Sequence, residues 1–434
     1  MTDQDYYRII FDRLQRTCRG CSYIIGAGTE LIQHGWRPGG LLVTVESADQ
    51  LWKMAVEWGL QIHIPVLGAH NERVLAPIDF EISLSHENFQ LYADMQTQHH
   101  YFRKYLMPVT KFLEGFFIKH KLPFLMDLTP SGGHILFWIE KGTKAWTATA
   151  AVGYLEDDLI GCYQYRDPGD IKRREGVDLT AGRVFSGLGR LSEFLGYIAK
   201  NAHQNEGSIP VTICDSAEKS INYDNSWAGD SAFMRGIRTP FSLHKKNIQK
   251  YGMYWQPPLV DVLKTYYDGT TLKQHRDFEH LLSAMWSVDK AAEHATTHDG
   301  TIPRANDSML GFIELYKRSG LYAFHQEFDR HPGLARGQAL QRAAADAGIH
   351  HNTRKMMENP YPALLQPINI KRFVGDLVLR HNWHPKEVAC LIRDLYEHPQ
   401  HTYWGQMDWF KSPSSTKANY YGRLYGGMAF WECG

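Results

Sequence analysis

The chain has 434 residues, 43% of them hydrophobic, which is enough for sizeable hydrophobic cores and, by length alone, for about three domains. Its 47 basic residues balance its 47 acidic residues, which excludes a protein that coats nucleic acid indiscriminately, so any nucleic-acid binding has to be local. The N-terminal stretch is acidic and no apolar run reaches the ~18 residues of a membrane span, so neither a signal peptide nor a membrane span is expected.

The six cysteines do not form a disulfide framework in a chain of this length, which favours a reduced, cytoplasmic setting. Cys18 and Cys21 have the spacing of half a zinc knuckle, Cys-x-x-Cys. They either bind zinc or are two ordinary thiols that follow a first helix. Most of the 22 histidines are expected at the surface.

Hydrophobic periodicity predicts alternating helices and strands in the first third of the chain. An amphipathic helix is expected over residues 4–17, a strand over 40–46 and a second helix over 48–58. A strand over 75–84 and a long helix over 102–120 follow. This alternation indicates an α/β fold.

Asp79 and Glu81 lie one residue apart in the apolar, β-branched run that predicts the strand over 75–84. Residues i and i+2 of a strand point to the same face, so both carboxylates are able to approach one cation. Carboxylate oxygens are the ligands that Mg²⁺ and Mn²⁺ prefer. The alternative interpretation is an acidic pair on the solvated face of an edge strand.

The segment 128–134, Leu-Thr-Pro-Ser-Gly-Gly-His, leads directly into a predicted strand over 135–139. A glycine pair before a strand allows backbone N–H groups to approach a ligand closely. His134, at the start of the strand, is able to donate to a phosphate oxygen, and Ser131 lies three residues before it. A second glycine-rich segment, 182–190, lacks the third glycine and the preceding strand of a dinucleotide-binding loop, so we reject that site.

A third carboxylate is expected from Asp224, eleven residues before Arg235. Asp215 is the alternative because it ends a better strand pattern, and Asp230 is the least favoured of the three. Between residues 231 and 250 the chain has five Lys or Arg residues and no acidic residue. In a chain without net charge, this local excess of positive charge suits a phosphate-rich partner.

The character of the chain changes near Pro257 and Pro258, and helical periodicity dominates from about residue 272 onward. Two helices are expected over 369–381 and 385–398. We therefore predict a catalytic domain at 1–255, a linker or helical connection at 256–300 and a helical C-terminal domain at 301–434.

Aromatic and basic residues lie close together near the C-terminus: Trp404, Trp409, Tyr420, Tyr421 and Arg423. Aromatic side chains interleaved with basic groups stack on the bases of single-stranded nucleic acid. The alternative is that these residues simply pack within the helical domain.

The order of these motifs resembles the archaeo-eukaryotic primase superfamily, the primase-polymerases. The resemblance covers residues 40–250 and rests on the acidic pair, Ser-Gly-Gly-His, a third aspartate and Arg-x-x-Arg-x-Pro-x-Ser-x-His-Lys, in that order. It implies an α/β (α+β) catalytic core with an RRM-like sheet, followed by an all-α domain. That helical domain is similar to those that follow primase cores in mobile-element replication proteins, where they help to begin primer synthesis.

The resemblance also implies roles for individual residues. Asp79-Phe-Glu81 matches the Asp-x-Glu version of the first motif, so two Mg²⁺ or Mn²⁺ ions are expected at Asp79, Glu81 and Asp224. The triphosphate of the incoming nucleotide is expected at Ser131, His134, Arg235, Arg238, His244 and Lys245. The implied partners are a single-stranded DNA template, nucleoside triphosphates and a replicative helicase or another replication protein.

The expected function is template-dependent nucleotidyl transfer by two metal ions, as in a DNA primase or DNA polymerase that copies single-stranded DNA. One alternative is a metal-dependent phosphoesterase, which has no need of the basic stretch after the third aspartate. A second is a catalytically inactive replication-initiation or single-strand-binding protein. Such a protein has no physical reason to keep three acidic motifs together, because their like charges repel.

Overall fold

The described residues of the computed structural model are 1–17, 23–26, 41–43, 47–52, 61–164, 176–203, 210–215, 219–244, 251–253, 258–298, 301–358, 365–398 and 413–433. The chain divides into two compact units. The first contains Met1–Gly153, Arg166–Asn225 and Ala232–Phe312, and the second contains Tyr154–Tyr165, Ser226–Ser231 and Ile313–Gly434.

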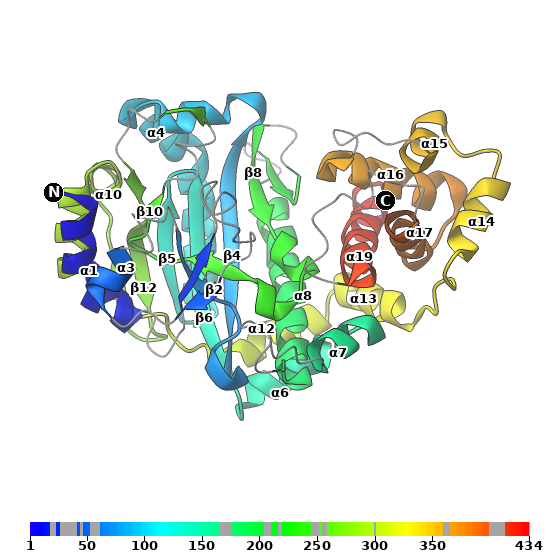
Figure 1. The fold of residues 1–434 in the computed structure, drawn as a ribbon, viewed down its shortest axis with the longest axis horizontal. Helices are drawn as coiled ribbons and strands as arrows, with labels where there is room; N and C mark the ends of the chain where they lie inside the picture. Colours follow the sequence, from blue (N-terminus) through cyan, green and yellow to red (C-terminus); the bar gives the residue numbers. More distant parts are fainter. Residues whose placement is uncertain are drawn as a thin grey trace. The chain divides into compact units, whose positions relative to one another are not determined.

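A seven-stranded sheet forms the centre of the first unit (Figure 1). In spatial order its strands are β13 (Leu272–Gln274), β12 (Val262–Tyr267), β5 (Phe124–Thr129), β6 (Gly132–Glu140), β4 (Arg73–Leu84), β8 (Lys219–Asp224) and β7 (Val211–Ile213). Neighbouring strands are antiparallel except β7 and β8, which are parallel. The mixed α/β class predicted from the alternating pattern is therefore confirmed.

Strand β4 shows why the acidic pair shares a face. Ile78, Phe80 and Ile82 are buried, whereas the intervening Asp79 and Glu81 are only partly buried. Helix α8 (Leu179–Ala202) packs against β4 and β7 (Figure 1). The period of two along β4 thus separates a core face from a face with carboxylates, as the sequence predicted.

The glycine-rich segment 182–190 lies inside α8 and is helical. At Gly187 a Cβ atom would lie 2.1 Å from the backbone oxygen of Thr149 in α6 (Lys144–Val152). Glycine therefore allows α8 and α6 to approach closely. The rejection of a dinucleotide-binding loop agrees with this helical conformation.

Two smaller sheets also belong to the described part of the first unit. One contains, in spatial order, β2 (Leu41–Val43), β1 (Tyr23–Gly26), β3 (Gln61–Pro65) and β9 (Gly236–Arg238), all antiparallel. The other is the antiparallel pair β10 (Leu243–His244) and β11 (Leu259–Val260). The basic stretch predicted from the sequence thus contributes β9 and β10.

Helices of the first unit include α1 (Asp3–Thr17), α3 (Ala48–Trp52), α4 (Met95–Tyr101), α5 (Met107–Lys119), α10 (Phe278–Met285) and α11 (Val288–Thr297). The helix expected over 102–120 is present, but its first turn, Phe102–Leu106, is π-helical. Pro108 follows at the start of α5 and has no N–H to donate, which interrupts the α-helical ladder at this point.

The second unit is helical. Its helices include α7 (Asp157–Gln164), α13 (Gly320–Arg330), α14 (Gln338–Ala345), α15 (His351–Glu358), α16 (Pro367–His381), α17 (Pro385–Glu397) and α19 (Ser414–Cys433), and α12 (Met309–Lys317) begins in the first unit. Helices α16 and α17 match the two predicted helices, with Asn382 in a left-handed conformation after α16 and Pro385 at the start of α17. The predicted helical C-terminal region is confirmed.

The segment 256–300 differs from the predicted linker. Strand β11 pairs with β10, and β12 pairs with β5 and continues the main sheet. The first unit therefore extends to Phe312. Strand β12 is buried along nearly its whole length, so it lacks the apolar–polar alternation that would have revealed a strand.

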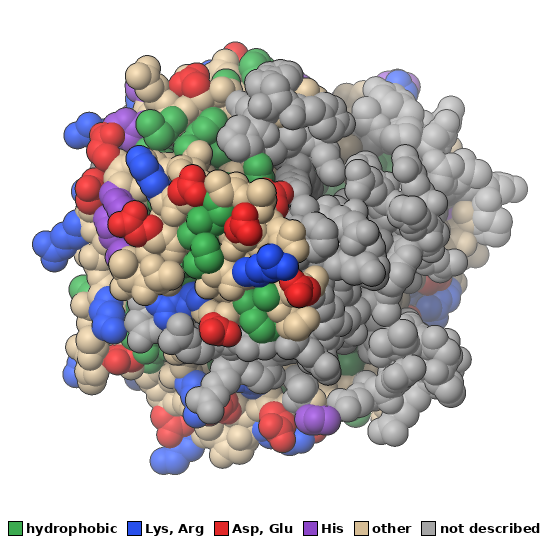
Figure 2. Space-filling view, turned by 60° about the vertical axis from the view of Figure 1, so that its left-hand side comes forward, with side chains coloured by type: hydrophobic (Ala, Val, Ile, Leu, Met, Phe, Trp, Pro, Cys, Tyr) green, Lys and Arg blue, Asp and Glu red, His purple; other side chains and the backbone are tan. Residues whose placement is uncertain are grey.

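Among the described residues, no helix is both long and apolar enough to cross a membrane. Figure 2 shows Lys and Arg side chains interleaved with Asp and Glu over the described part of one face. This mixture agrees with the balanced composition, so any site for a charged ligand has to be local.

Candidate metal and nucleotide site

Four charged side chains form a row across the main sheet. Asp127 of β5 is paired with His134 of β6, His134 with Asp79 of β4, and Asp79 with Asp224 of β8. Residues directly opposite each other on neighbouring strands share a face of the sheet. We call these four residues the charged row.

Glu81 lies two residues after Asp79 on β4 and therefore on the same face. Its partners in the register are Gly132 of β6 and Asn222 of β8. Asp79, Glu81 and Asp224, the three predicted metal ligands, are thus brought to one place. We call them the carboxylate cluster.

The register favours Asp224 over the other two candidates for the third carboxylate, because it places Asp224 beside Asp79. Asp215 follows the end of β7, and its backbone N–H donates to Oδ1 of Asn222 at 3.0 Å. Asp230 belongs to the second unit, where its carboxylate lies 3.0 Å from Nζ of Lys417.

His134 is buried between two carboxylates of the charged row. Its Nδ1 lies 3.0 Å from Oδ1 of Asp127, and its Nε2 lies 3.9 Å from Oδ1 of Asp79. Burial lowers the pKa of His134, but the negative charges of Asp127 and Asp79 outweigh this effect and raise it to about 9. His134 is therefore a cation at neutral pH.

Asp79 lies between opposing electrostatic influences. Burial, together with the charges of Asp224 and Asp127, raises the pKa of Asp79 to about 6, against the lowering effects of His134 and Arg238. Carboxylates held this close repel one another when ionised. A divalent cation would offset the repulsion, and a cluster that offers carboxylate oxygens suits Mg²⁺ or Mn²⁺.

Arg238 lies next to the charged row although it belongs to the smaller sheet. Its Nε is 3.4 Å from Oδ2 of Asp261, a fully buried residue just before β12. Burial raises the pKa of Asp261 to about 7, against the lowering effect of Arg238. Asp261 also interacts electrostatically with Asp127 and His134, and Arg238 with Asp79. Arg238 thus supplies a second positive charge beside the carboxylate cluster.

Two further predicted residues meet at Tyr92. Ser131 lies in the two-residue turn between β5 and β6, and its hydroxyl is hydrogen-bonded to that of Tyr92. Tyr92 also interacts electrostatically with Glu81. The ring of His244 stacks on that of Tyr92 with 6.3 Å between the ring centroids. Ser131 and His244 therefore lie near the Glu81 end of the carboxylate cluster.

The glycine pair before His134 has a different role from the predicted one. Gly132 and Gly133 lie inside β6, where a Cβ atom would be 1.9 Å from the backbone oxygen of Phe80 and 2.6 Å from that of Asp127, respectively. The backbones of β4 and β5 leave no space for side chains here. The glycines permit this close approach of strands, which differs from the expected approach to a phosphate.

Of the remaining predicted ligand-binding residues, the structure describes Arg235 but not Lys245. Arg235 lies in the turn before β9, and its carbonyl oxygen accepts a hydrogen bond from the N–H of Val66 at 3.0 Å. Lys245 lies outside the described residues, as do Cys18 and Cys21.

The aromatic group near the C-terminus is largely buried where it is described. Tyr420 of α19 is 2% exposed and packs over Gly229, where a Cβ atom would lie 2.7 Å from the ring. Arg423 is also buried, and Tyr421 stacks on Tyr425. Packing within the helical unit is therefore the interpretation that fits these residues. Trp404 and Trp409 lie outside the described residues.

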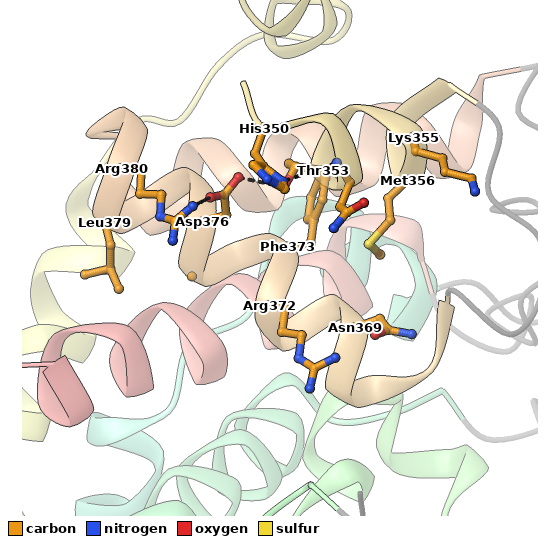
Figure 3. A pocket seen from close by; sticks show the side chains of 12 residues that line it. His350, Thr353, Lys355, Met356, Asn369, Arg372, Phe373, Asp376, Leu379 and Arg380 are labelled. Carbon is orange, nitrogen blue, oxygen red and sulfur yellow. Dashed lines mark hydrogen bonds and ion pairs between the residues drawn. The ribbon is translucent and has the colours of Figure 1, made fainter. Parts of the chain in front are cut away.

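The second unit contains a cavity of about 550 Å³ between α15 and α16 (Figure 3). Basic side chains are prominent in its lining, namely His350, Lys355, Arg372 and Arg380. Arg380 lies 3.5 Å from Asp376, and Figure 3 shows Arg372 extending away from that pair. The cavity is therefore a local basic site beside two described helices of this unit.

Two carboxylates of the site, Asp127 and Asp261, were missed in the sequence. A signal for Asp127 was present, because a two-residue turn at Pro130 and Ser131 places Asp127 opposite His134. No comparable signal existed for Asp261, since its neighbour Arg238 comes from a different sheet.

The pair of His134 and Asp127 predicts a pH-dependent stability of the metal-free protein. The pKa of folded His134, about 9, exceeds the ordinary value of 6.5, so its stabilising effect is complete below pH 6.5 and is lost as the pH rises through 9. In urea titrations with EDTA, the parent is expected to lose about 1–3 kcal/mol more unfolding free energy than His134→Gln over this range. Equal losses in both proteins would contradict the ion pair.

The site thus combines a cluster of three carboxylates with two cationic side chains, His134 and Arg238. The carboxylates are suited to divalent cations, and the cationic groups are suited to a bound anion. Comparison of the chain with protein-family models, with curated proteins and with solved structures found no match.

Proposed function

We propose that the protein is a template-dependent nucleotidyltransferase of the primase-polymerase type, with an RRM-like catalytic sheet, that extends nucleic acid on a single-stranded DNA template. The observation that carries this proposal is the register of β4 and β8. It sets Asp79 beside Asp224, with Glu81 on the same face and His134 on the next strand.

Asp79, Glu81 and Asp224 would hold the metal ions. Two bound Mg²⁺ or Mn²⁺ ions supply stabilisation of both the attacking and the leaving oxygen in an in-line displacement at phosphorus. In nucleotidyl transfer a 3′-hydroxyl oxygen bonds to the α-phosphorus, the bond from that phosphorus to the pyrophosphate oxygen breaks, and the hydroxyl proton passes to solvent water. The three carboxylates come from neighbouring positions on two paired strands, which fixes their relative positions before any ion binds.

His134 and Arg238 would neutralise the triphosphate. Each lies within ion-pair distance of a buried carboxylate, His134 at 3.0 Å from Asp127 and Arg238 at 3.4 Å from Asp261, so both cations are already present beside the cluster. Charge-assisted hydrogen bonds to phosphate oxygens are the strongest that such side chains make. Further triphosphate contacts are proposed at Ser131 and His244, which meet at Tyr92, and at Arg235 and Lys245.

The arrangement of charged side chains favours the transferase over both alternatives, a phosphoesterase and a protein that only binds DNA. A phosphoesterase uses water as the nucleophile and needs the carboxylate cluster, but it does not need cations arranged for a triphosphate. The pairing of Arg238 and His134 with buried acids beside the cluster favours the transferase. A protein that only binds DNA has no use for Asp79, Glu81 and Asp224 together, because their mutual repulsion is a cost without a cation.

The proposal is tested by following both ends of the triphosphate. The protein is incubated with single-stranded DNA, Mg²⁺ or Mn²⁺, and nucleoside triphosphates labelled at the α- or γ-phosphate. Nucleotidyl transfer places the α-label in a polynucleotide and the γ-label in pyrophosphate. Products without a supplied primer indicate a primase, and products only with a primer indicate a polymerase. Release of inorganic phosphate alone, or DNA binding without reaction, would overturn the proposal.

The basic cavity of the second unit is proposed to contact the phosphates of the template. Arg372→Glu is expected to weaken binding of single-stranded DNA by about three- to tenfold. It is also expected to reduce the slope of log affinity against log salt concentration by about one. Fluorescence anisotropy of a labelled oligonucleotide at several salt concentrations measures both quantities. Arg318→Glu, an exposed arginine elsewhere in this unit, is the matched control, and an equal loss in both variants would contradict a local site.

A further inference from the structure

Three histidines outside the charged row gather where the end of β13 meets α11. His294 and His298 lie four residues apart, on one face at the C-terminal end of α11, and His275 follows β13 directly. One ligand nitrogen from each ring lies within 4.8 Å of the other two. All three belong to the first unit. We call them the histidine cluster.

Backbone carbonyl groups determine which nitrogen of each ring carries the proton. Nε2 of His294 is 2.7 Å from the carbonyl oxygen of Leu263, Nδ1 of His275 is 3.0 Å from that of Asp277, and Nδ1 of His298 is 3.1 Å from that of His294. A carbonyl oxygen only accepts, so these ring nitrogens donate and the other nitrogen of each ring carries a lone pair. Metal-binding histidines are oriented in the same way.

His294 has an unsatisfied nitrogen. The residue is fully buried, and its Nδ1 has no hydrogen-bond partner among the described residues. A buried polar atom left in this state costs about 1–3 kcal/mol. The ring also stacks on His298 with 4.0 Å between the ring centroids. A bound cation would satisfy the lone pair.

We propose that His275, His294 and His298 bind one Zn²⁺ ion or a similar late first-row divalent ion. Neutral imidazole nitrogens bind Zn²⁺ at about 2.0–2.1 Å, whereas Mg²⁺ prefers oxygen. Nitrogens around one such ion are about 3.3 Å apart, so small rotations of the partly exposed rings of His275 and His298 close the site. His280, whose ring centroid is 4.7 Å from that of His275, or a water molecule takes the fourth position.

The proposed ion has a structural role. The ion would link the segment after β13 to α11. In α11, Nε2 of His294 donates a hydrogen bond to the carbonyl oxygen of Leu263 in β12. Leu263 is paired with Asp127 of the charged row, so the histidine cluster braces the strand beside the candidate site. Binding energy at a structural zinc site contributes to folding stability. This inference stands independently of the proposed nucleotidyl transfer.

The test compares zinc content in matched variants. Each chelator-stripped protein is dialysed against micromolar Zn²⁺ with excess Mg²⁺, and zinc per chain is measured by elemental analysis. The parent is expected to hold one zinc more than His275→Ala/His298→Ala, and zinc is expected to raise the unfolding temperature of the parent but not of this double variant. His86→Ala/His100→Ala, which removes two exposed histidines, is expected to match the parent. Equal zinc content and equal unfolding temperatures in all three proteins would overturn the proposal.

A second measurement on the unaltered chain does not depend on the folding of a variant. Co²⁺ is added to the zinc-free protein, and its visible spectrum is recorded. A four-coordinate site with imidazole ligands is expected to give intense visible bands without a thiolate charge-transfer band, and one equivalent of Zn²⁺ is expected to abolish them. Only the weak bands of six-coordinate Co²⁺ would show that the histidines are simply packed together.

Discussion

Asp79→Asn and Asp224→Asn will each lower the rate of nucleotide incorporation by about a thousandfold, because stabilisation by a bound metal ion is worth several kcal/mol in the transition state. The two side chains are adjacent in the register of β4 and β8, so removal of either charge disrupts the same carboxylate cluster. Binding of single-stranded DNA is expected to remain within about twofold of the parent, since contacts to phosphates generally supply most of a protein's affinity for nucleic acid and a carboxylate makes none. Incorporation is measured with α-labelled nucleotide under single-turnover conditions.

Two control variants make this prediction specific. Asp215→Asn removes the acidic residue that the sequence left as an alternative to Asp224, and Glu87→Gln removes an exposed acid that pairs with Lys219. Both are expected to keep activity within about threefold of the parent, as is usual for changes away from the reacting groups. A loss in Asp215→Asn as large as that in Asp224→Asn would contradict the assignment of the third ligand.

The second large effect is expected at His134. His134→Ala is predicted to lower kcat/KM for the nucleoside triphosphate by about ten- to a hundredfold, mostly through KM, because a hydrogen bond to a charged group contributes roughly 1.5–3 kcal/mol. Asp127→Asn keeps the imidazole but removes the carboxylate 3.0 Å from it, so a smaller loss is expected, together with a lower pKa in the pH profile of kcat/KM.

Steady-state kinetics over a range of pH separates a role for His134 in binding from a purely structural one. His100→Ala, at an exposed histidine of α4, serves as the control with unchanged constants. If His134→Ala alters thermal stability but leaves KM for the triphosphate unchanged, the proposed contact with phosphate is contradicted. The same result would leave His134 as a structural partner of Asp127.

The carboxylate face of β4 was predictable because it depends only on the two-residue period of a strand. Asp79 and Glu81 share a face whatever their neighbours are. The choice of Asp224 over Asp215 was not predictable in the same way. It depends on the register of β8 against β4, and the segment around Asp215 has the better strand pattern.

Other parts of the site depended on long-range contacts that local patterns do not encode. Arg238 belongs to the smaller sheet and Asp261 directly precedes β12 of the main sheet, so their contact at 3.4 Å depends on the tertiary fold. The same strand, β12, was hidden within the predicted linker because it is buried on both faces. The sequence predicted that Gly132 and Gly133 allow a ligand to approach the backbone, whereas the atom nearest to a Cβ at Gly132 is the carbonyl oxygen of Phe80, on another strand.

The histidine cluster was predictable from the sequence only in part. The spacing of His294 and His298 is that of a metal-binding pair on a helix, so this part of the signal was present in the sequence. Because most of the 22 histidines were expected at the surface, this spacing was not interpreted as a metal-binding pair. The burial of His294 and the proximity of His275 become evident only once α11 packs beside the end of β13.

Asp79, Glu81 and Asp224 are proposed to hold divalent cations for a nucleoside triphosphate. Electron paramagnetic resonance of Mn²⁺ measures this directly, with free Mn²⁺ followed as parent or Asp79→Asn/Glu81→Gln protein is added, with and without a non-hydrolysable nucleoside triphosphate. The parent is expected to bind Mn²⁺, nucleotide is expected to tighten this binding by at least about tenfold, and the double variant is expected to lose both effects. Equal Mn²⁺ binding by parent and double variant, unaffected by nucleotide, would contradict this proposal.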